Sequence, residues 1–188
     1  MLRKIGISLA LVTAATAIGL YIVNPSNTAS SDPRARILGF ATYRIPAKSM
    51  VPTLRPGDYI VAGTYAYWKS DPAFGDVITF RYPRDPDQNY VKRVVGLPGD
   101  TIRMAGTQVW RNGELIHEPY VQYLSASQAR RGGRWLVPDG HYFVLGDNRD
   151  TSADSRFWGF LPRSHIIAKV KYVWLSDQDN AGPVKHGK

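Results

Sequence analysis

From about residue 37 onward, short apolar runs alternate with turn residues, and this spacing constrains the fold more than any other feature. The runs are rich in β-branched and aromatic residues, and Gly or Pro closes many of them. Runs of this kind are typical of short strands. They cover residues 59–62, 77–82, 90–95, 101–104 and 141–145. The sequence therefore predicts a mostly β domain with many loops.

Two further segments support this prediction. Asn112-Gly113, within "QVWRNGELI", is a strong signal for a tight hairpin. The run 166–174 alternates, so that one face is expected to carry Ile166, Ala168, Val170, Tyr172 and Trp174, and the other Lys169 and Lys171. We find no amphipathic helical pattern after the N-terminal segment.

The N-terminal segment has a different character. Arg3 and Lys4 precede residues 5–23, which contain no charge. A membrane-spanning helix needs roughly 17–25 apolar residues, whereas the apolar core of a cleavable signal peptide has about 7–15. The length favours a retained anchor over residues 1–23, and the basic pair predicts a cytoplasmic N-terminus with the remainder outside. A flexible linker (24–36), the β domain (37–176) and a polar tail (177–188) would follow.

Composition narrows the partners. The chain of 188 residues carries 24 basic and 15 acidic residues, a net charge of +9, which favours anionic partners such as nucleic acid or phospholipid. The predicted anchor favours a phospholipid membrane and argues against nucleic acid. No cysteine is present, which excludes disulfides, Cys-ligated zinc and thiol catalysis.

Ser49, in "IPAKSMVPT", is a candidate nucleophile, and a serine hydroxyl needs a base to react. Lys48 is its neighbour, but successive side chains of an extended segment point to opposite faces, so we expect Lys48 to be solvated. His141 could form a triad with Asp139 or Asp147, although no local signature supports that arrangement. If Ser49 is a nucleophile, its base is therefore expected from a position more distant in the chain than Lys48.

Lys92 is the strongest candidate for this base. The period of two in "NYVKRVV" places it on one strand face with Tyr90 and Val94, and Arg93 on the other. Apolar surroundings lower the pKa of an ammonium group. A shift towards neutrality costs roughly 3–4 kcal/mol, which ordinary packing rarely justifies. The alternative, that Lys92 extends its amine to solvent at the strand edge, is equally compatible with the pattern.

A third group of candidates lies in "GDNRDTSADSRFWGFLP", residues 146–162. Small polar and acidic residues at this density form turns whose side chains bind backbone amides. The potential ion-pairing residues are Asp147, Asp150, Asp154, Arg149 and Arg156. The segment is either a rigid solvated loop or a loop that supports a site, with the hydroxyl of Ser152 or Ser155 holding a catalytic group. The interleaved arginines argue against a metal site or a glycosidase carboxylate pair.

Three segments, in this order, resemble the conserved boxes of the bacterial type I signal peptidases: "SMVPTLRPGDYIVA", "GDVITFRYP…NYVKRVVGLPGD" and "GDNRDTSADSRFWGFLP". These enzymes are serine/lysine endopeptidases that remove N-terminal signal peptides from secreted preproteins. The resemblance implies an antiparallel β-sheet catalytic domain that is preceded in the chain by one N-terminal transmembrane helix. It also implies a single-pass protein of the cytoplasmic (inner) membrane, with the catalytic domain on the extracytoplasmic side and no metal or organic cofactor.

Residue by residue, the resemblance implies Ser49 as nucleophile and Lys92 as general base. Ser152 would orient the lysine amine, and the Asp154–Arg156 ion pair would support the site. Shallow pockets for small side chains, one and three residues before the cleavage point, would involve Ile45, Pro46, Ala47, Met50, Leu54, Tyr90 and Val91.

One position departs from part of the family. Some members carry a serine two residues before the nucleophile, whose hydroxyl helps to bind the oxyanion; here that residue is Ala47. We expect the Ser49 N–H and a substitute donor to bind the oxyanion instead. Losing one such donor without replacement costs about 10²–10³ in rate.

Three other functions fit parts of this pattern. A specialised peptidase of the same family could process a conjugation or pilus subunit. A basic, membrane-tethered domain could bind anionic ligands without catalysis, but it would not explain three ordered boxes. Self-cleaving repressors share a Ser/Lys arrangement but lack an N-terminal span, and no helix-turn-helix pattern precedes the catalytic region here.

Overall fold

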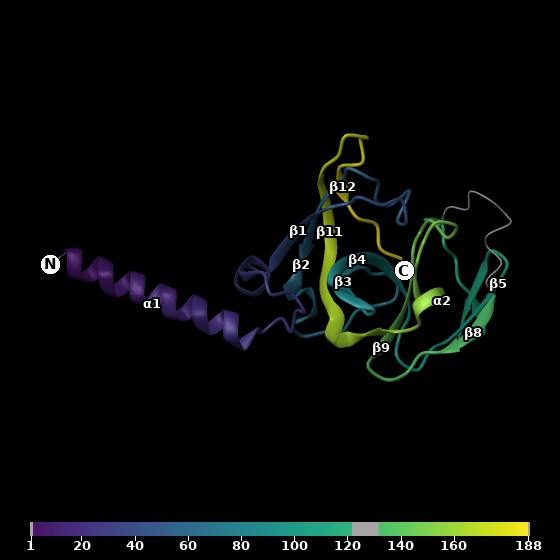
Figure 1. Ribbon diagram of the computed structural model, residues 1–188, viewed down its shortest axis with the longest axis horizontal. Coiled ribbons are helices and arrows are strands. Elements are labelled where there is room, and N and C mark those ends of the chain that lie inside the picture. Colours follow the sequence, from purple (N-terminus) through teal and green to yellow (C-terminus); the bar gives the residue numbers. More distant parts are fainter. Residues whose placement is uncertain (1, 122–131, 188) are drawn as a thin grey trace.

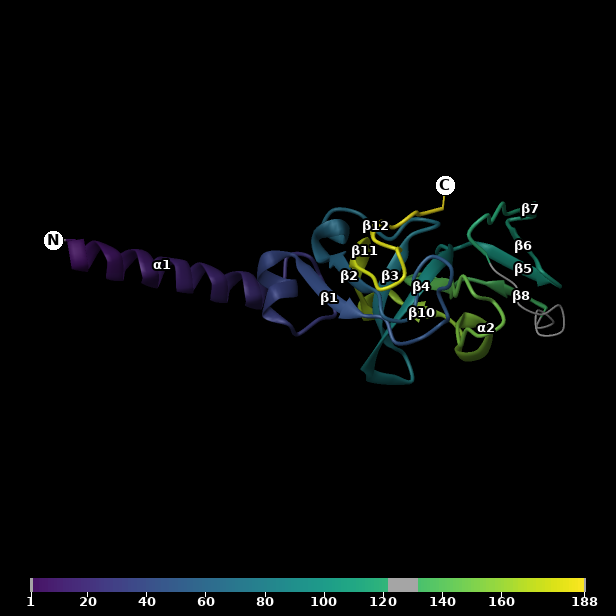
Figure 2. The same ribbon diagram turned by 90° about the horizontal axis from the view of Figure 1, so that it is seen from above.

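The computed structural model describes residues 2–121 and 132–187, with side chains from residue 9 onward. One long helix, α1 (Leu2–Val23), projects away from a β domain that contains the rest of the described chain (Figures 1 and 2). Among the described residues, no helix combines the length and the apolar character required to cross a bilayer.

The main sheet has eight strands, and every pair in it is antiparallel. In spatial order its path is β1 (Phe40–Arg44), β2 (Tyr59–Gly63), β11 (Ile166–Leu175), β3 (Val77–Tyr82), β4 (Asp85–Gly96), β9 (His141–Leu145) and β10 (Leu161–Pro162), while β12 (Gly182–Pro183) pairs with β11. The prediction of a mainly antiparallel β domain is confirmed.

A smaller four-stranded sheet extends from one side of the domain (Figure 1). Its order is β7 (Glu114–Leu115), β6 (Gln108–Arg111), β5 (Thr101–Ala105) and β8 (Gly133–Leu136). The predicted hairpin joins β6 to β7, with Asn112 at φ 54° and Gly113 at φ 91°. Both values lie in the left-handed region that Asn-Gly adopts readily in tight hairpins.

The remaining helical segments are short. They are the π-helical turn η1 (Arg34–Leu38), the 3₁₀ turns η2 (Thr64–Tyr67) and η3 (Arg163–His165), and α2 (Ser155–Trp158). Asp154 caps α2, since its side chain accepts a hydrogen bond from the backbone N–H of Arg156.

All five predicted strands are present, together with the hairpin and β11, but β1, β8, β10 and β12 were not predicted. Two of these, β10 and β12, are two residues long and contain proline, which cannot donate to a sheet ladder. Their existence depends on the partner strands, so a local sequence pattern carries little signal for them.

The predicted alternation of β11 is correct only as far as Val170. Ile166, Ala168 and Val170 are buried, but Tyr172 and Trp174 are 46% and 53% exposed, and Val173 is buried instead. Irregularities in the pairing with β2 lie between Val170 and Tyr172 and between Val173 and Leu175. A β-bulge inserts one extra residue and thereby exchanges the faces of the strand beyond it.

Residues 24–36, expected as a free tether, lie along the domain. Thr28 Oγ1 donates to the Ile167 carbonyl at 2.8 Å, and the Ala29 N–H donates to the Ile166 carbonyl at 3.1 Å. Ser26 and Thr28 are buried. Hydrogen bonds to β11 thus hold this segment in place.

The apolar core behind the predicted nucleophile joins a loop to the main sheet. Ile45, Met50 and Leu54 are buried together with side chains from β2, β3 and β11. The loop that contains Ser49 is therefore anchored by its own apolar residues, which fixes its backbone relative to the sheet.

Candidate active site

The loop between β1 and β2 carries Ser49. Its ends are closed by hydrogen bonds from the Ile45 N–H to the Asp58 carbonyl and from the Gly57 N–H to the Ile45 carbonyl, both 2.8 Å. Inside the loop, the Leu54 N–H donates to the Met50 carbonyl at 2.9 Å. Ser49 lies between exposed Lys48 and buried Met50, so its hydroxyl is presented at the surface of a firmly closed turn.

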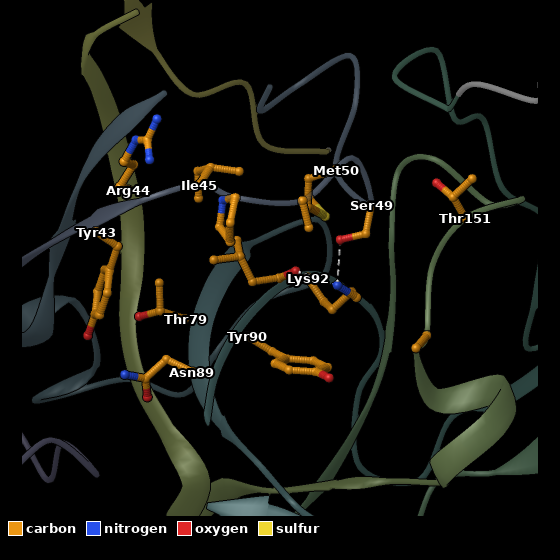
Figure 3. A pocket seen from close by; sticks show the side chains of 14 residues that line it. Tyr43, Arg44, Ile45, Ser49, Met50, Thr79, Asn89, Tyr90, Lys92 and Thr151 are labelled. Atoms are coloured by element: carbon orange, nitrogen blue, oxygen red, sulfur yellow. Dashed lines mark hydrogen bonds between the residues drawn. The ribbon is translucent and has the colours of Figure 1, made fainter. Parts of the chain in front are cut away.

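Lys92 reaches Ser49 from β4. Its Nζ lies 2.8 Å from Ser49 Oγ and 2.9 Å from the Val91 carbonyl oxygen (Figure 3). The side chain is only 3% exposed, and its amine lies 5.4 Å from the centre of the Tyr90 ring. The alternative in which the amine extends into solvent is therefore wrong.

Burial has a direct effect on the Lys92 amine. Loss of hydration disfavours its charged form and lowers its pKa from 10.5 to about 8, although the nearby carboxylates of Asp154 and Asp147 oppose this shift. At pH 7 a fraction of roughly one in ten amines is then neutral, far more than for an ordinary lysine. A neutral amine can accept a proton, which is what a serine nucleophile requires.

The other candidate bases lie elsewhere. Lys48 is exposed, as expected. His141 Nδ1 lies 2.9 Å from the Asp139 carbonyl oxygen at the start of β9, where His141 pairs with Pro162 of β10. Asp147 contacts Arg93 and not a histidine. The structure thus does not form the triad that His141 would need.

A cavity of about 440 Å³ opens beside Ser49 and Lys92 (Figure 3). Six of the seven predicted pocket residues line it: Ile45, Pro46, Ala47, Met50, Tyr90 and Val91. Leu54 does not; it is fully buried in the core with Met50, so its prediction as a pocket residue is wrong. A backbone hydrogen bond from the Leu54 N–H to the Met50 carbonyl joins these two residues within the turn.

Several lining residues were not predicted. They are Tyr43, Arg44, Thr79, Asn89, Thr151 and Ala153. Tyr43 and Arg44 belong to β1, a strand that the sequence analysis did not identify. Asn89 directly precedes Tyr90 on β4, and this proximity to a predicted pocket residue could have identified Asn89 as a lining residue.

The Asp154–Arg156 pair is present and buried. Arg156 Nε lies 2.8 Å from Asp154 Oδ1, and Nη2 lies 2.9 Å from Oδ2, which makes a two-pronged contact. Asp154 also accepts from the Gly146 N–H at 3.1 Å, and Arg156 donates to the Arg149 carbonyl at 2.7 Å. The pair therefore ties the backbone of the 146–156 loop together.

Ser152 differs from the expectation. Its side chain is buried, but among the residues that the structure describes its hydroxyl oxygen has no hydrogen-bond partner. The hydrogen bond to the Lys92 amine that the resemblance implies is thus absent here. Ser155, the other hydroxyl considered, accepts from the Val144 N–H at 2.9 Å and so supports β9.

A second buried ion pair was missed. Arg93 is fully buried and binds Asp147 with two hydrogen bonds of 2.8 and 2.7 Å. Thr53 Oγ1 donates to Asp147 at 2.5 Å, which links this pair to the nucleophile loop. Arg149, considered as a partner of Asp147, pairs with Glu118 at 2.5 Å instead. Arg93 lies within an apolar run, and this position in the sequence could have predicted that its side chain is buried.

We also searched the described residues for groups of side chains that could bind a metal ion. Within residues 2–121 and 132–187, no cluster of three or more His, Cys, Asp or Glu side chains could hold an ion. The carboxylates nearest to Lys92 are occupied by arginines.

Gly146 offers a test of how tightly the site is packed. A Cβ at this position would collide with the Ser152 hydroxyl and the Ser49 carbonyl oxygen. We expect Gly146→Ala to lower the free energy of unfolding by about 1–3 kcal/mol, because overpacking forces the backbone to move. Gly63→Ala is the matched control, since its Cβ would meet only ordinary contacts at 3.6 Å. Denaturant titration of both variants measures the difference; equal stability would contradict this packing.

Comparison with known proteins shows which family the chain resembles. The family model described as "Signal peptidase, peptidase S26" matches residues 10–175. The signal peptidase I of Pseudomonas fluorescens is 36% identical over 71% of this chain and 64% of its own length, and that of Pseudomonas aeruginosa is 36% identical over 73% and 65%. The signal peptidase I of Aquifex aeolicus is 30% identical over 71% and 75%.

The chain spans a little under two thirds of the length of the two Pseudomonas relatives. A solved signal peptidase I from Enterococcus faecalis superposes on 53% of this chain and 97% of its own, with 31% identity and a TM-score of 0.47. From the family match over most of its length and from these relatives, the chain belongs to the signal peptidase family, peptidase S26.

Proposed function

We propose that this protein is a serine endopeptidase that removes N-terminal signal peptides from preproteins, with Ser49 as nucleophile and Lys92 as general base. The observation that carries the proposal is the 2.8 Å contact between Ser49 Oγ and a lysine amine that burial makes partly neutral. Family membership supports the same reaction, since the relatives are signal peptidases I.

The reaction would begin when Ser49 Oγ attacks the scissile carbonyl carbon while Lys92 Nζ takes the hydroxyl proton. The resulting ammonium then protonates the leaving amine as the peptide bond breaks, and an ester to Ser49 remains. Next, the neutral Lys92 deprotonates a water molecule, which attacks this ester and releases the signal peptide. One amine serves both half-reactions because its pKa lies near the working pH.

The substrate would bind in the cavity beside this pair. Residues 93–96 of β4 pair with β9, whereas residues 85–92 have a described strand partner only in β3. The other edge of this half of β4 borders the cavity through Asn89, Tyr90 and Val91. An extended peptide could add to such an edge by backbone hydrogen bonds, and the cavity walls would select its side chains.

The supporting roles follow the same reasoning. The Asp154–Arg156 pair would fix the loop that faces Ser49, and Ser152 would orient the Lys92 amine after a rotation of its free hydroxyl. Ala47 lines the cavity but has no side-chain donor, so the Ser49 N–H would bind the oxyanion with a second donor other than a side chain at position 47.

Substitution of the two reacting groups tests the proposal. We expect Ser49→Ala to abolish cleavage of a preprotein, and Lys92→Ala to reduce it by about 10²–10⁴, the usual contribution of a general base. Lys48→Ala, one residue from the nucleophile but exposed, is the control and should keep full activity. Cleavage is followed by the mobility shift of the mature protein; full activity of the Lys92 variant would refute the mechanism.

The pH dependence of cleavage follows from the Lys92 pKa of about 8. Only the neutral amine is a base, so the rate should increase about tenfold per pH unit below this value and level off above it. A rate profile with a fluorogenic signal-sequence peptide measures this pKa. A rate that is independent of pH between 6 and 9 would exclude Lys92 as the titrating base.

The membrane anchor is a further part of the proposal. We propose that residues 1–23 anchor the protein in the cytoplasmic membrane, with residues 37–176 on the extracytoplasmic side, residues 24–36 between them and residues 177–188 at the end. The uncharged run 5–23 supports it, and so does the exposure of Leu9, Leu11, Val12, Ile18 and Ile22 on α1. Tethering would raise the local concentration of membrane-inserted preproteins.

Fractionation of cells that produce the full chain tests the anchor. We expect the protein in the membrane fraction, resistant to extraction by alkaline carbonate, with its N-terminal sequence intact. Protease added to the extracytoplasmic side should degrade the β domain. Recovery of a soluble protein that begins after residue 23 would show that the segment is removed and not retained.

A further inference from the structure

We infer that residues 178–187, which we call the C-terminal strap, position the nucleophile loop (49–58) against the strand that carries Lys92. The strap follows β11, pairs briefly with it through β12, and then crosses towards β4 (Figure 1, yellow). It lies beyond residue 175, where the match to the family model ends. This inference rests on the proposed peptidase activity and adds a positioning element to it.

The first part of the strap holds the nucleophile loop. Asn180 Nδ2 donates to the Thr53 carbonyl at 3.2 Å and to Asp58 Oδ2 at 2.6 Å. Gln178 Nε2 donates to the Pro56 carbonyl at 2.9 Å. Such bonds from side chains to backbone carbonyls fix the path of a loop that has no strand partner of its own.

The second part of the strap holds the residue next to Lys92. Arg93 Nη1 donates to the Lys185 carbonyl at 3.1 Å. The Val77 N–H donates to His186 Nδ1 at 3.2 Å, and the Gly187 N–H donates to the Gly75 carbonyl at 3.2 Å. The strap thus reaches the fully buried guanidinium that follows the proposed base in β4.

These two sets of contacts form a closed circuit. Thr53 is held through its carbonyl by Asn180 and through its hydroxyl by Asp147. Asp147 is held by Arg93, which binds the strap again at Lys185. Within the circuit, Val184 packs in the same core cluster as Met50, the residue after the nucleophile.

The consequence concerns the distance between the reacting atoms. Ser49 lies on the loop and Lys92 on the strand, so their separation depends on how these two elements are held together. Displacements of about 1 Å between reacting groups can reduce rates about 10²-fold. No residue of the strap lines the cavity, so loosening it should affect the chemical step more than substrate binding.

Asn180→Ala in the full chain tests the inference. We expect kcat to fall roughly five- to tenfold, in line with the loss of two hydrogen bonds, while KM changes less than twofold. The amide protons of Leu54, bonded inside the loop, and of Gly57, which closes it, should exchange faster with deuterium. Asp177→Ala, an exposed position just before the strap, is the matched control and should retain wild-type values.

His186→Ala removes the acceptor of the Val77 N–H at the far end of the strap and provides an independent variant. It should lower kcat in the same direction, at a temperature where circular dichroism shows the variant to be folded. Wild-type kcat in both variants would overturn the inference, and so would faster exchange without a change in kcat, which would indicate a merely structural role.

A failure of the proposed function would look different. In that case the wild-type chain itself would cleave no signal-sequence peptide. The inference fails separately when the wild-type chain cleaves and the Asn180→Ala and His186→Ala variants both cleave equally well.

Discussion

The burial of one amine is the constraint on which the site depends. Lys92 is 3% exposed, and the lowering of its pKa to about 8 corresponds to roughly 3 kcal/mol of disfavoured charge. A fold tolerates this only if other interactions offset it. Three apolar clusters among the described residues provide such interactions, and one of them includes Ile45 and Met50 of the segment that carries Ser49.

Two buried arginine–carboxylate pairs then organise the loops around this amine. Arg93–Asp147 and Arg156–Asp154 are both two-pronged and almost fully buried. Removing one partner of such a pair leaves an uncompensated buried charge and is strongly destabilising. Because each carboxylate already has an arginine, neither is available as a close partner for Lys92, and desolvation remains the dominant influence on its pKa.

One border of the cavity is an edge of β4 that is left unpaired in the described sheet. Strand β4 pairs with β9 only from Arg93 onward, so the half that leads to Lys92 keeps one edge without a described strand partner. The three ordered sequence segments lie within the part of the chain that the family model matches, residues 10–175. The C-terminal strap lies outside this matched part, and its Asn180 and Gln178 donate hydrogen bonds to the nucleophile loop.

The sequence alone determined the β class, most strand positions and the Asn112-Gly113 hairpin, because these depend on local alternation and turn chemistry. It named Ser49 and Lys92 as the candidate pair through the resemblance of three ordered segments to a known family, because the strand pattern alone left the state of Lys92 open. Tertiary structure decided the rest. The bulges in β11, the burial of Leu54, the Arg93–Asp147 pair and the docking of residues 24–36 and 178–187 all depend on partners distant in the chain. No local pattern specifies which distant group a buried polar atom or a short strand will meet, and that choice is made only when the chain packs.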